Sequence, residues 1–168
     1  METLAIFKSE DIGDEEAKSF HVRQATRGIV IDRDMNTVLM YVPGKNYYGL
    51  PGGGVEEGET HEQAFIRECM EEICCEVEIL TPLGKTLEYK KAQGINESHG
   101  FIARVVGEKG EYIPTGDEAE LGIVLKWVSI PEAIELITTN KESFSSNGKH
   151  AIERNEIFLK KAQEVLNK

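Results

Sequence analysis

The stretch LPGGGVEEGETHEQAFIRECMEEICC, residues 50–75, joins a glycine-rich loop to an acidic helix and decides the fold. Thr60, with Gln63 three positions later, matches a helix capping box. From there to about residue 73 the chain contains neither glycine nor proline. The sequence therefore predicts a loop that ends near residue 59 and a helix that continues to about Ile73.

Glu68, Glu71 and Glu72 occupy one face of this predicted helix, because about 100° of rotation per residue places them within about 100° of arc. Apolar residues, Phe65 and Ile73 among them, form the adjacent face that packs into the core. Like charges at this spacing destabilise a helix by about 0.2–0.5 kcal/mol per pair. A bound cation reverses the sign, and hard oxygen ligands suit Mg²⁺ or Mn²⁺.

The three glycines at 52–54 supply the second half of the expected site. Glycine adopts positive φ angles and lets backbone carbonyls or amides approach a ligand closely. A cation here would meet a backbone carbonyl as well as the carboxylates. Phosphates are the commonest groups whose charge such cations neutralise, so the pattern favours a phosphate-bearing substrate.

Residues 53–75 resemble the signature of the Nudix hydrolase family of MutT-like proteins. That signature is Gly, five residues, Glu, seven residues, Arg-Glu, a bulky apolar residue, any residue, Glu-Glu, any residue, Gly and a bulky apolar residue. Every charged position is matched at the correct spacing. Cys74 stands where the family has glycine, a position that often needs a left-handed backbone. Cys69 and Cys75 replace larger apolar residues, which is a milder departure.

The resemblance covers about residues 22–138 and implies a fold, an activity and a set of roles. The implied fold is an α/β/α sandwich with a mixed β-sheet between helices. The implied activity is hydrolysis of the pyrophosphate bond of a nucleoside diphosphate linked to another moiety. Glu68, Glu71, Glu72 and the Gly53 carbonyl would hold Mg²⁺ or Mn²⁺, Glu68 or a nearby carboxylate would act as general base, and Glu59 and Arg67 would pair to hold the loop and helix together.

Candidates outside the signature each have a simpler interpretation. Glu118 and Glu120 are candidates for a further metal ligand or base, with a solvated acidic loop as the alternative. Tyr48 is a candidate for stacking on a base, although it also suits the edge of the core. Arg27 and Arg104 are candidates for holding phosphate or ribose groups, although isolated arginines are usually surface residues.

The remaining pattern predicts a single α/β domain over residues 1–168. Residues 1–20 form an acidic extension with one short strand candidate at 4–7, and residues 147–167 form a C-terminal helix. Strands are expected at 25–32, 37–42, 76–80, 84–91, 99–107 and 125–130, a helix at 131–138, and a loop at 108–122.

The formal net charge of −11 argues against a nucleic-acid polymer or a membrane surface as partner, since both would require a basic face. The N-terminus lacks the features of a secretory signal, so a cytoplasmic location is expected. The expected partner is a small-molecule nucleotide, and the resemblance adds a possible homodimer.

A catalytically silent Nudix-like domain that binds a nucleotide and regulates a partner is the alternative function. Silent relatives would usually lose a signature carboxylate, and this chain keeps them all. The substrate stays open between nucleoside triphosphates and nucleotide sugars such as ADP-ribose.

Overall fold

The structure is a computed structural model that describes residues 1–8, 12–91, 94–114 and 116–168, without the side chains of 117 and 118. Its elements, in chain order, are β1 (Thr3–Phe7), α1 (Asp14–Ala17), β2 (Val22–Ile31), β3 (Asn36–Val42), a 3-10 turn (Pro43–Lys45), β4 (Tyr47–Gly49), α2 (His61–Ile73), β5 (Val77–Lys90), β6 (Gly94–Val105), α3 (Gly116–Leu121), β7 (Val124–Ser129), α4 (Ile130–Thr138), a second 3-10 turn (Lys141–Ser143) and α5 (Ser146–Leu166).

The strands form one mixed sheet in the order β1-β5-β6-β2-β3-β4, with β7 paired to β3. β1 runs parallel to β5 and β2 runs parallel to β6, while the other pairs are antiparallel. Within the described strands β2 and β3 pair at one position, Ile31 opposite Thr37. The sheet therefore opens between β2 and the strands β3, β4 and β7. The rest of this edge of β2 is free to pair with another segment.

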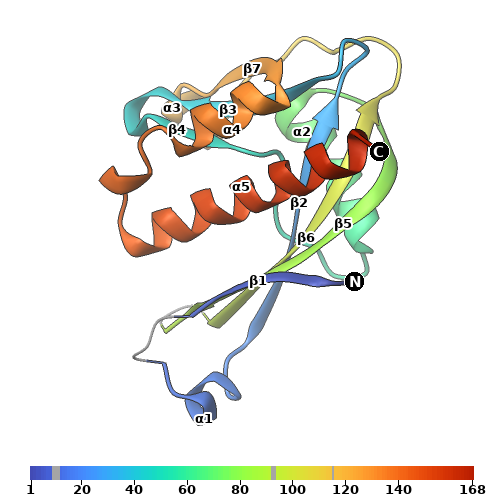
Figure 1. The fold of residues 1–168 in the computed structure, drawn as a ribbon. Coiled ribbons are helices and arrows are strands. Elements are labelled where there is room, and N and C mark those ends of the chain that lie inside the picture. Colours follow the sequence, from blue (N-terminus) through green and yellow to red (C-terminus); the bar gives the residue numbers. More distant parts are fainter. Residues whose placement is uncertain (9–11, 92–93, 115) are drawn as a thin grey trace.

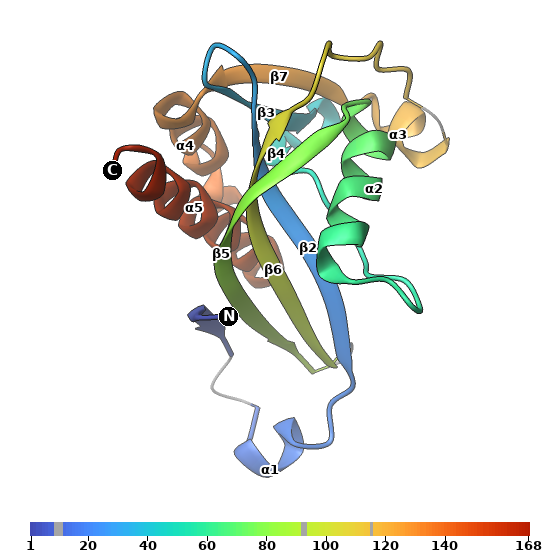
Figure 2. The same cartoon turned by 90° about the vertical axis from the view of Figure 1, so that its right-hand side faces the viewer.

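Helices cover both faces of the sheet, with α4 and α5 on one side and α2 on the other (Figures 1 and 2). Each face has its own hydrophobic cluster. The cluster under α4 and α5 includes Ile29, Ile102 and Phe158, and the cluster under α2 includes Phe65 and Phe101. The predicted α/β/α sandwich with a mixed sheet is confirmed.

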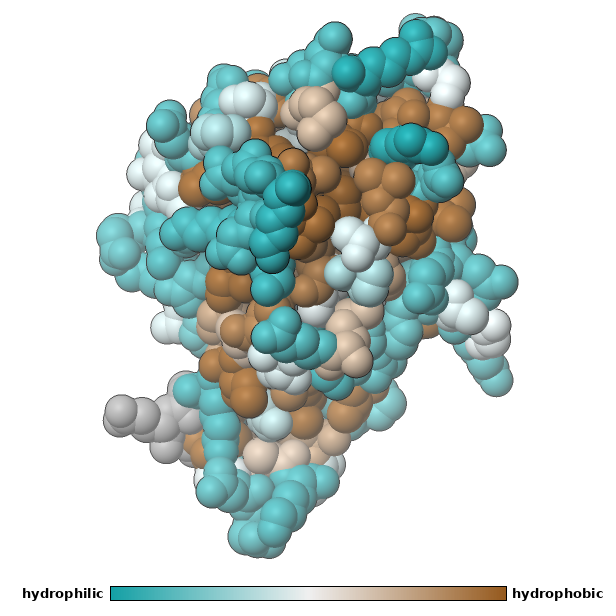
Figure 3. Space-filling view, turned by 45° about the vertical axis from the view of Figure 1, so that its right-hand side comes forward, coloured by the Kyte–Doolittle hydropathy of each residue, from teal (hydrophilic) through white to brown (hydrophobic). Residues whose placement is uncertain are grey.

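Hydrophobic side chains also reach the surface. In Figure 3 they form a broad band through the middle of the molecule, bordered by hydrophilic residues. No helix within the described ranges has the length and apolar character that a membrane span requires.

Two details differ from the predictions. The strands expected at 76–80 and 84–91 are one strand, β5, whose register shifts near Pro82 accommodate the proline. Residues 108–122 include the short helix α3. The strand candidate at 4–7 is confirmed as β1, which pairs with β5.

Candidate active site

The glycine loop lies along the open edge of β2. Three backbone hydrogen bonds hold it there: the Thr26 amide donates to the Gly53 carbonyl at 2.8 Å, the Gly28 amide to the Pro51 carbonyl, and the Val55 amide to the Gln24 carbonyl. The loop therefore occupies the strand position that β3 leaves open. This fixes the backbone at residues 51–55 relative to the sheet.

Helix α2 starts directly after the loop and brings its carboxylates back to it. The predicted capping box is present, since the Thr60 side chain accepts from the Gln63 amide and the Gln63 side chain accepts from the Thr60 amide. At the penultimate residue of the helix, Glu72 accepts a hydrogen bond from the Gly52 amide at 2.6 Å. The helix thus starts and nearly ends in contact with the same loop.

Gly53 is where the helix and loop approach most closely. A Cβ atom at this position would lie 2.2 Å from Oε1 of Glu68, so the Glu68 carboxylate would have to move to make room for a side chain. The missing Cβ lets the Glu68 carboxylate lie against the loop backbone. The glycine at position 53 therefore allows the carboxylate its present place.

Arg67 links the loop to three carboxylates. Its Nε and Nη2 donate to the two oxygens of Glu59 at 2.8 and 3.1 Å, and Nη2 also donates to the Gly54 carbonyl at 2.9 Å. Its Nη1 donates to both Glu68 and Glu71 at 3.0 Å. The hydrogen bond from Arg67 lowers the pKa of Glu59, and the bond to Glu59 raises the pKa of Arg67. The pairing of Glu59 with Arg67 that was expected from the sequence is present.

The donor atoms at this site suit a divalent cation. Three carboxylates and the Gly53 carbonyl are hard oxygen ligands of the kind that Mg²⁺ and Mn²⁺ prefer. In the described part of the chain, no group of three or more His, Cys, Asp or Glu side chains is already arranged to hold a metal. Instead Arg67 contacts two of the carboxylates, and Glu72 accepts from Gly52. The cradle at Gly53 and the donor set fit a metal that would take over the contacts Arg67 now makes.

Arg27 is the one predicted substrate-binding residue that lies near the carboxylates. It interacts electrostatically with Glu72 and Glu68, and its guanidinium donates to the Thr26 carbonyl at 2.8 Å. Burial, followed by the charge of Arg154, lowers the pKa of Arg27 to about 10. Its side chain therefore carries a poorly solvated positive charge beside the acidic site.

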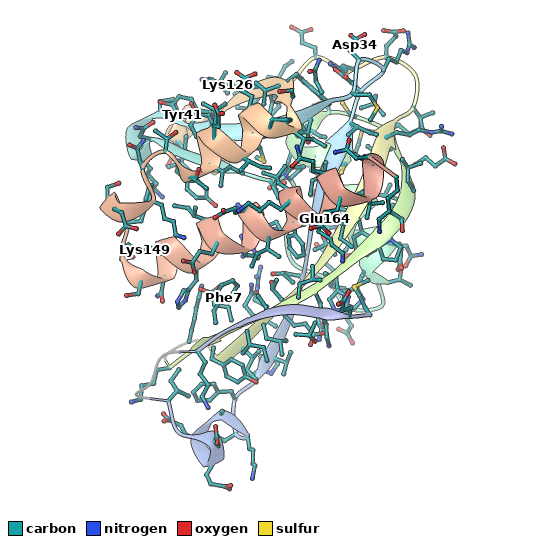
Figure 4. The ribbon with its side chains drawn as sticks, viewed as in Figure 1. Phe7, Asp34, Tyr41, Lys126, Lys149 and Glu164 are labelled. Carbon is teal, nitrogen blue, oxygen red and sulfur yellow. The ribbon has the colours of Figure 1, made fainter. Side chains whose placement is uncertain are left out.

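The other predicted residues lie elsewhere. Tyr48 is buried, stacks on Tyr41 with ring centroids 4.5 Å apart, and accepts a hydrogen bond from Lys126. The Tyr41 and Lys126 side chains lie close together, with Lys126 Nζ 4.5 Å from the Tyr41 ring centroid (Figure 4). Arg104 forms an exposed ion pair with Glu78 at 2.7 Å. Glu120 is an exposed residue of α3. The side chain of Glu118 lies outside the described residues.

Two polar residues of α5 that the sequence reasoning did not select, Arg154 and Asn155, belong to the surroundings of Arg27. Arg154 acts on Arg27 electrostatically, as does Tyr47, and Asn155 donates a hydrogen bond to the Tyr47 hydroxyl. Arg154 and Asn155 are buried among Ile152, Phe158 and Leu159. The sequence spacing does indicate that these two residues are buried. Asn155 lies three residues after Ile152 and Arg154 lies four residues before Phe158, so both lie on the apolar face of the helix.

Comparison with known proteins gives one family match and several relatives. The model of the NUDIX domain matches residues 22–147. The chain is 34% identical over 89 residues to an RNA pyrophosphohydrolase of Sulfurovum sp., covering 52% of this chain and 55% of that protein. It is 36% identical over 64 residues to an 8-oxo-dGTP diphosphatase of Proteus vulgaris, covering 36% of this chain and 54% of that protein. The chain spans about half the length of the curated relatives it matches.

Solved structures share the fold. A MutT protein from Methanosarcina mazei Go1 has a TM-score of 0.58 at 15% identity, with 88% of this chain and 97% of that chain covered. A NUDIX hydrolase from Nitrosomonas europaea has a TM-score of 0.57 at 20% identity, with 88% and 90% covered. The family match includes the glycine loop and all of α2 with its carboxylates. On this evidence, the chain belongs to the NUDIX domain family.

Proposed function

We propose that this chain is a nucleotide pyrophosphohydrolase that depends on Mg²⁺ or Mn²⁺. The observation that carries the proposal is the meeting of Glu68 and Glu72 with the loop at Gly52–Gly53, with Glu71 beside them on Arg67. The printed names of the relatives support the reaction class, since they are a diphosphatase and a pyrophosphohydrolase.

The metal would be held by Glu68, Glu71, Glu72 and the Gly53 carbonyl. When bound, such a metal lowers the pKa of its water and neutralises charge on phosphoryl oxygens. The Gly53 carbonyl already accepts one hydrogen bond, from Thr26, and its second lone pair is the one that the metal would use. Glu118 and Glu120 stay proposed as further ligands from outside the helix.

The protein side chains supply positioning and proton transfer. Arg67 and Glu59 fix the loop to the helix through two parallel hydrogen bonds, so that the carboxylates keep their places. Glu68, or a carboxylate beside it, takes the proton from the water that attacks phosphorus, which is the role of a general base. Arg27 supplies positive charge next to these carboxylates, where the phosphate oxygens of a substrate arrive.

The substrate class is best found with a panel. It contains nucleoside triphosphates, 8-oxo-dGTP, ADP-ribose and other nucleotide sugars, dinucleoside polyphosphates and an oligoribonucleotide with a 5′-triphosphate. The last compound tests the expectation that no nucleic-acid polymer is a partner. The cytoplasmic location and the homodimer stay predictions, as do substrate contacts from Tyr48 and Arg104.

The first prediction concerns Glu72→Gln. The amide keeps an acceptor for the Gly52 amide, but it removes a negative charge from the metal site. We expect turnover to fall by about 100-fold or more, because metal binding and proton transfer both require carboxylates here. Phosphate release is measured after a coupling phosphatase, with Mg²⁺ and with chelator.

The matched control is Glu62→Gln, an exposed residue in the first turn of the same helix, for which turnover should be unchanged. No metal-dependent turnover of any panel compound by the folded wild-type protein would refute the hydrolase proposal. Nucleotide binding without turnover would favour the regulatory alternative instead.

A further inference from the structure

Arg154 of α5 is a buried guanidinium without a carboxylate partner. Its side chain is 7% exposed. Its Nε and Nη2 both donate to Oδ1 of Asn155 at 3.2 Å, and no ion pair of Arg154 is found within the described residues. Asn155, which is fully buried, is itself oriented by a hydrogen bond of 3.3 Å from its Nδ2 to the Tyr47 hydroxyl. The guanidinium is thus fixed in place by neutral groups.

Glu88 is a buried acidic residue on the same side of the molecule. Its Oε2 lies 3.3 Å from Nζ of Lys90, and its Oε1, 3.6 Å from Nδ1 of His150, has no hydrogen-bond partner within the described residues. Glu88 acts on Arg154 electrostatically but does not pair with it. The positive charge of Arg154 is therefore only partly compensated.

Arg27 points to the same side of the sheet. Side chains alternate along a strand, so Arg27 shares a face with Ile29 and Ile31, which pack in the cluster under α5. Within the described part of the chain it forms no ion pair, and the charge of Arg154 acts on it. Strand alternation thus directs Arg27 to the side of the sheet that α5 covers, where Arg154 is buried, and the charges of Arg154, Glu72 and Glu68 all act on Arg27.

Such an arrangement is costly unless an anion occupies it. A charged group removed from water destabilises the fold unless it is paired and hydrogen-bonded, and two like charges add mutual repulsion. The planar fork of a guanidinium matches two oxygens of a phosphate or carboxylate. Where a folded chain does not itself offset the free energy of burying a charge, we expect a ligand of opposite charge to bind.

We propose that Arg27 and Arg154 together bind a phosphate of the substrate other than the one attacked by water, and hold it under α5 beside the carboxylates of α2. This inference rests on the proposed function for the identity of the ligand as a substrate. It assigns the second phosphate of the pyrophosphate group to these two side chains. Asn155 and Tyr47 act as positioning residues, since they orient Arg154 through hydrogen bonds.

Arg23 extends the row of basic residues on β2. It lies four residues before Arg27 on the same strand face and acts electrostatically on Arg154. It also lines a surface hollow of about 320 Å³ together with Gly54, Val55, Glu56 and Glu57.

Thermal melting with tripolyphosphate as probe, in phosphate-free buffer with chelator, tests the site without hydrolysis. The wild-type protein should gain melting temperature as the probe is added, because a ligand that binds only the folded state stabilises it. Arg154→Gln and Arg27→Gln should lose most of that gain. The control Arg33→Gln, an exposed arginine paired with Glu108, should keep it.

A second readout follows from the burial argument. Without the probe, Arg154→Gln should melt at the same or a higher temperature than the wild-type protein, since it removes a buried charge that forms no ion pair with the described residues. Should Arg154→Gln fail to fold, Arg154→Lys replaces it and should keep the charge but lose most of the probe-induced gain. Equal probe-induced gains in wild type, Arg154→Gln (or Arg154→Lys) and Arg27→Gln would overturn the proposal.

Kinetics separate this inference from the proposed function. If the chain hydrolyses its substrate, Arg154→Gln should raise KM by about tenfold with a smaller change in kcat, as expected for the loss of one charge-assisted contact. The ratio of the KM values for a nucleoside triphosphate and for ADP-ribose indicates which phosphate the two arginines bind. A nucleoside triphosphate offers a terminal phosphate, whereas ADP-ribose offers one that is linked to a sugar. Turnover with an unchanged KM in the variant refutes the anion site alone. A probe-dependent gain without turnover of any compound refutes the hydrolase alone.

Discussion

At the scale of single residues, the lack of a side chain at Gly53 lets the Glu68 carboxylate lie against the loop. Gly53 faces Glu68 so closely that no side chain fits between them, whereas the neighbouring Gly54 has more room. There the nearest atom to an added Cβ would be the flexible end of Arg23, at 3.1 Å. Two adjacent glycines in one loop therefore carry different constraints.

This difference gives the prediction for Gly53→Ala. The new methyl group would overlap the Glu68 carboxylate and push it away from the loop. We expect Mg²⁺ affinity and turnover to fall by about tenfold or more, because ligands displaced by about 1 Å no longer converge. Gly54→Ala is the control and should retain most of both. Metal titration by calorimetry and the phosphate-release assay measure the effects, and equal behaviour of the two variants would contradict the packing argument.

Cys74 is a residue whose conformation the sequence left open and the structure supplies. It ends α2 with φ 50° and ψ 39°, in the left-handed region where the family has glycine. The signature spacing identified the position, and the helix-end geometry required the conformation. The fate of Tyr48 was less predictable, because its burial against Tyr41 depends on the pairing of β3 with β4.

At the scale of elements, α2 is attached to the sheet at its first turn by a stack of two histidines. His61 begins the helix and lies over His99 of β6, with ring centroids 3.6 Å apart, and its Nε2 is hydrogen-bonded to Gln24 of β2 at 2.8 Å. Burial, together with the charge of His99, lowers the pKa of His61 below 6.5. The contact therefore favours a neutral His61.

The pH dependence of stability follows from this direction. Because the unfolded chain binds more protons at this position than the folded one, the contribution of His61 is fully present above about pH 6.5. It is lost as the pH falls through the lower pKa of the folded state. Urea unfolding at pH 7.5 and 5.5 should show a smaller loss of stability on acidification for His61→Gln than for the wild-type protein. Equal losses of stability on acidification in the two proteins would exclude His61 as the source of this pH dependence.

Helices and strands differed in how well the sequence predicted them. The bounds of α2 and α4 were predicted closely, because capping residues mark their starts. α3 was missed, since its sequence GDEAEL shows no apolar periodicity. The break predicted in β5 was wrong, because Pro82 and Gly84 sit at register shifts that a single strand tolerates.

At the scale of the whole molecule, the sequence predicted the layers but not how distant segments meet. The loop along β2 joins residues 24–28 to residues 51–55 through backbone atoms, which carry no sequence pattern. The same holds for Arg27 and Arg154, which come from opposite ends of the chain. Their proximity follows from the packing of α5 on the sheet, and no local spacing encodes it.

The N-terminal strand gives the prediction at this scale. Leu4 packs against the cluster under α5 and touches Gly84, whereas Ile6 on the same strand is 59% exposed. Since Leu4 is only partly buried, Leu4→Ala should lower the free energy of unfolding by about 1–2 kcal/mol, below the range for fully buried leucines. Ile6→Ala should change it by about 0.5 kcal/mol or less. Urea unfolding measures both, and a Leu4→Ala protein as stable as wild type would show that residues 1–8 contribute little to the sheet.

The attachment of the glycine loop to β2 has a consequence for solubility. An uncovered strand edge is a template for pairing with another chain, and proteins protect such edges to avoid aggregation. Here the segment that brings Gly53 to the carboxylates also covers the edge that β3 leaves open. The loop can leave β2 only by breaking three backbone hydrogen bonds, and each such opening would expose the edge of the strand. The same hydrogen bonds that position Gly53 beside the carboxylates thus keep this edge from pairing with another chain.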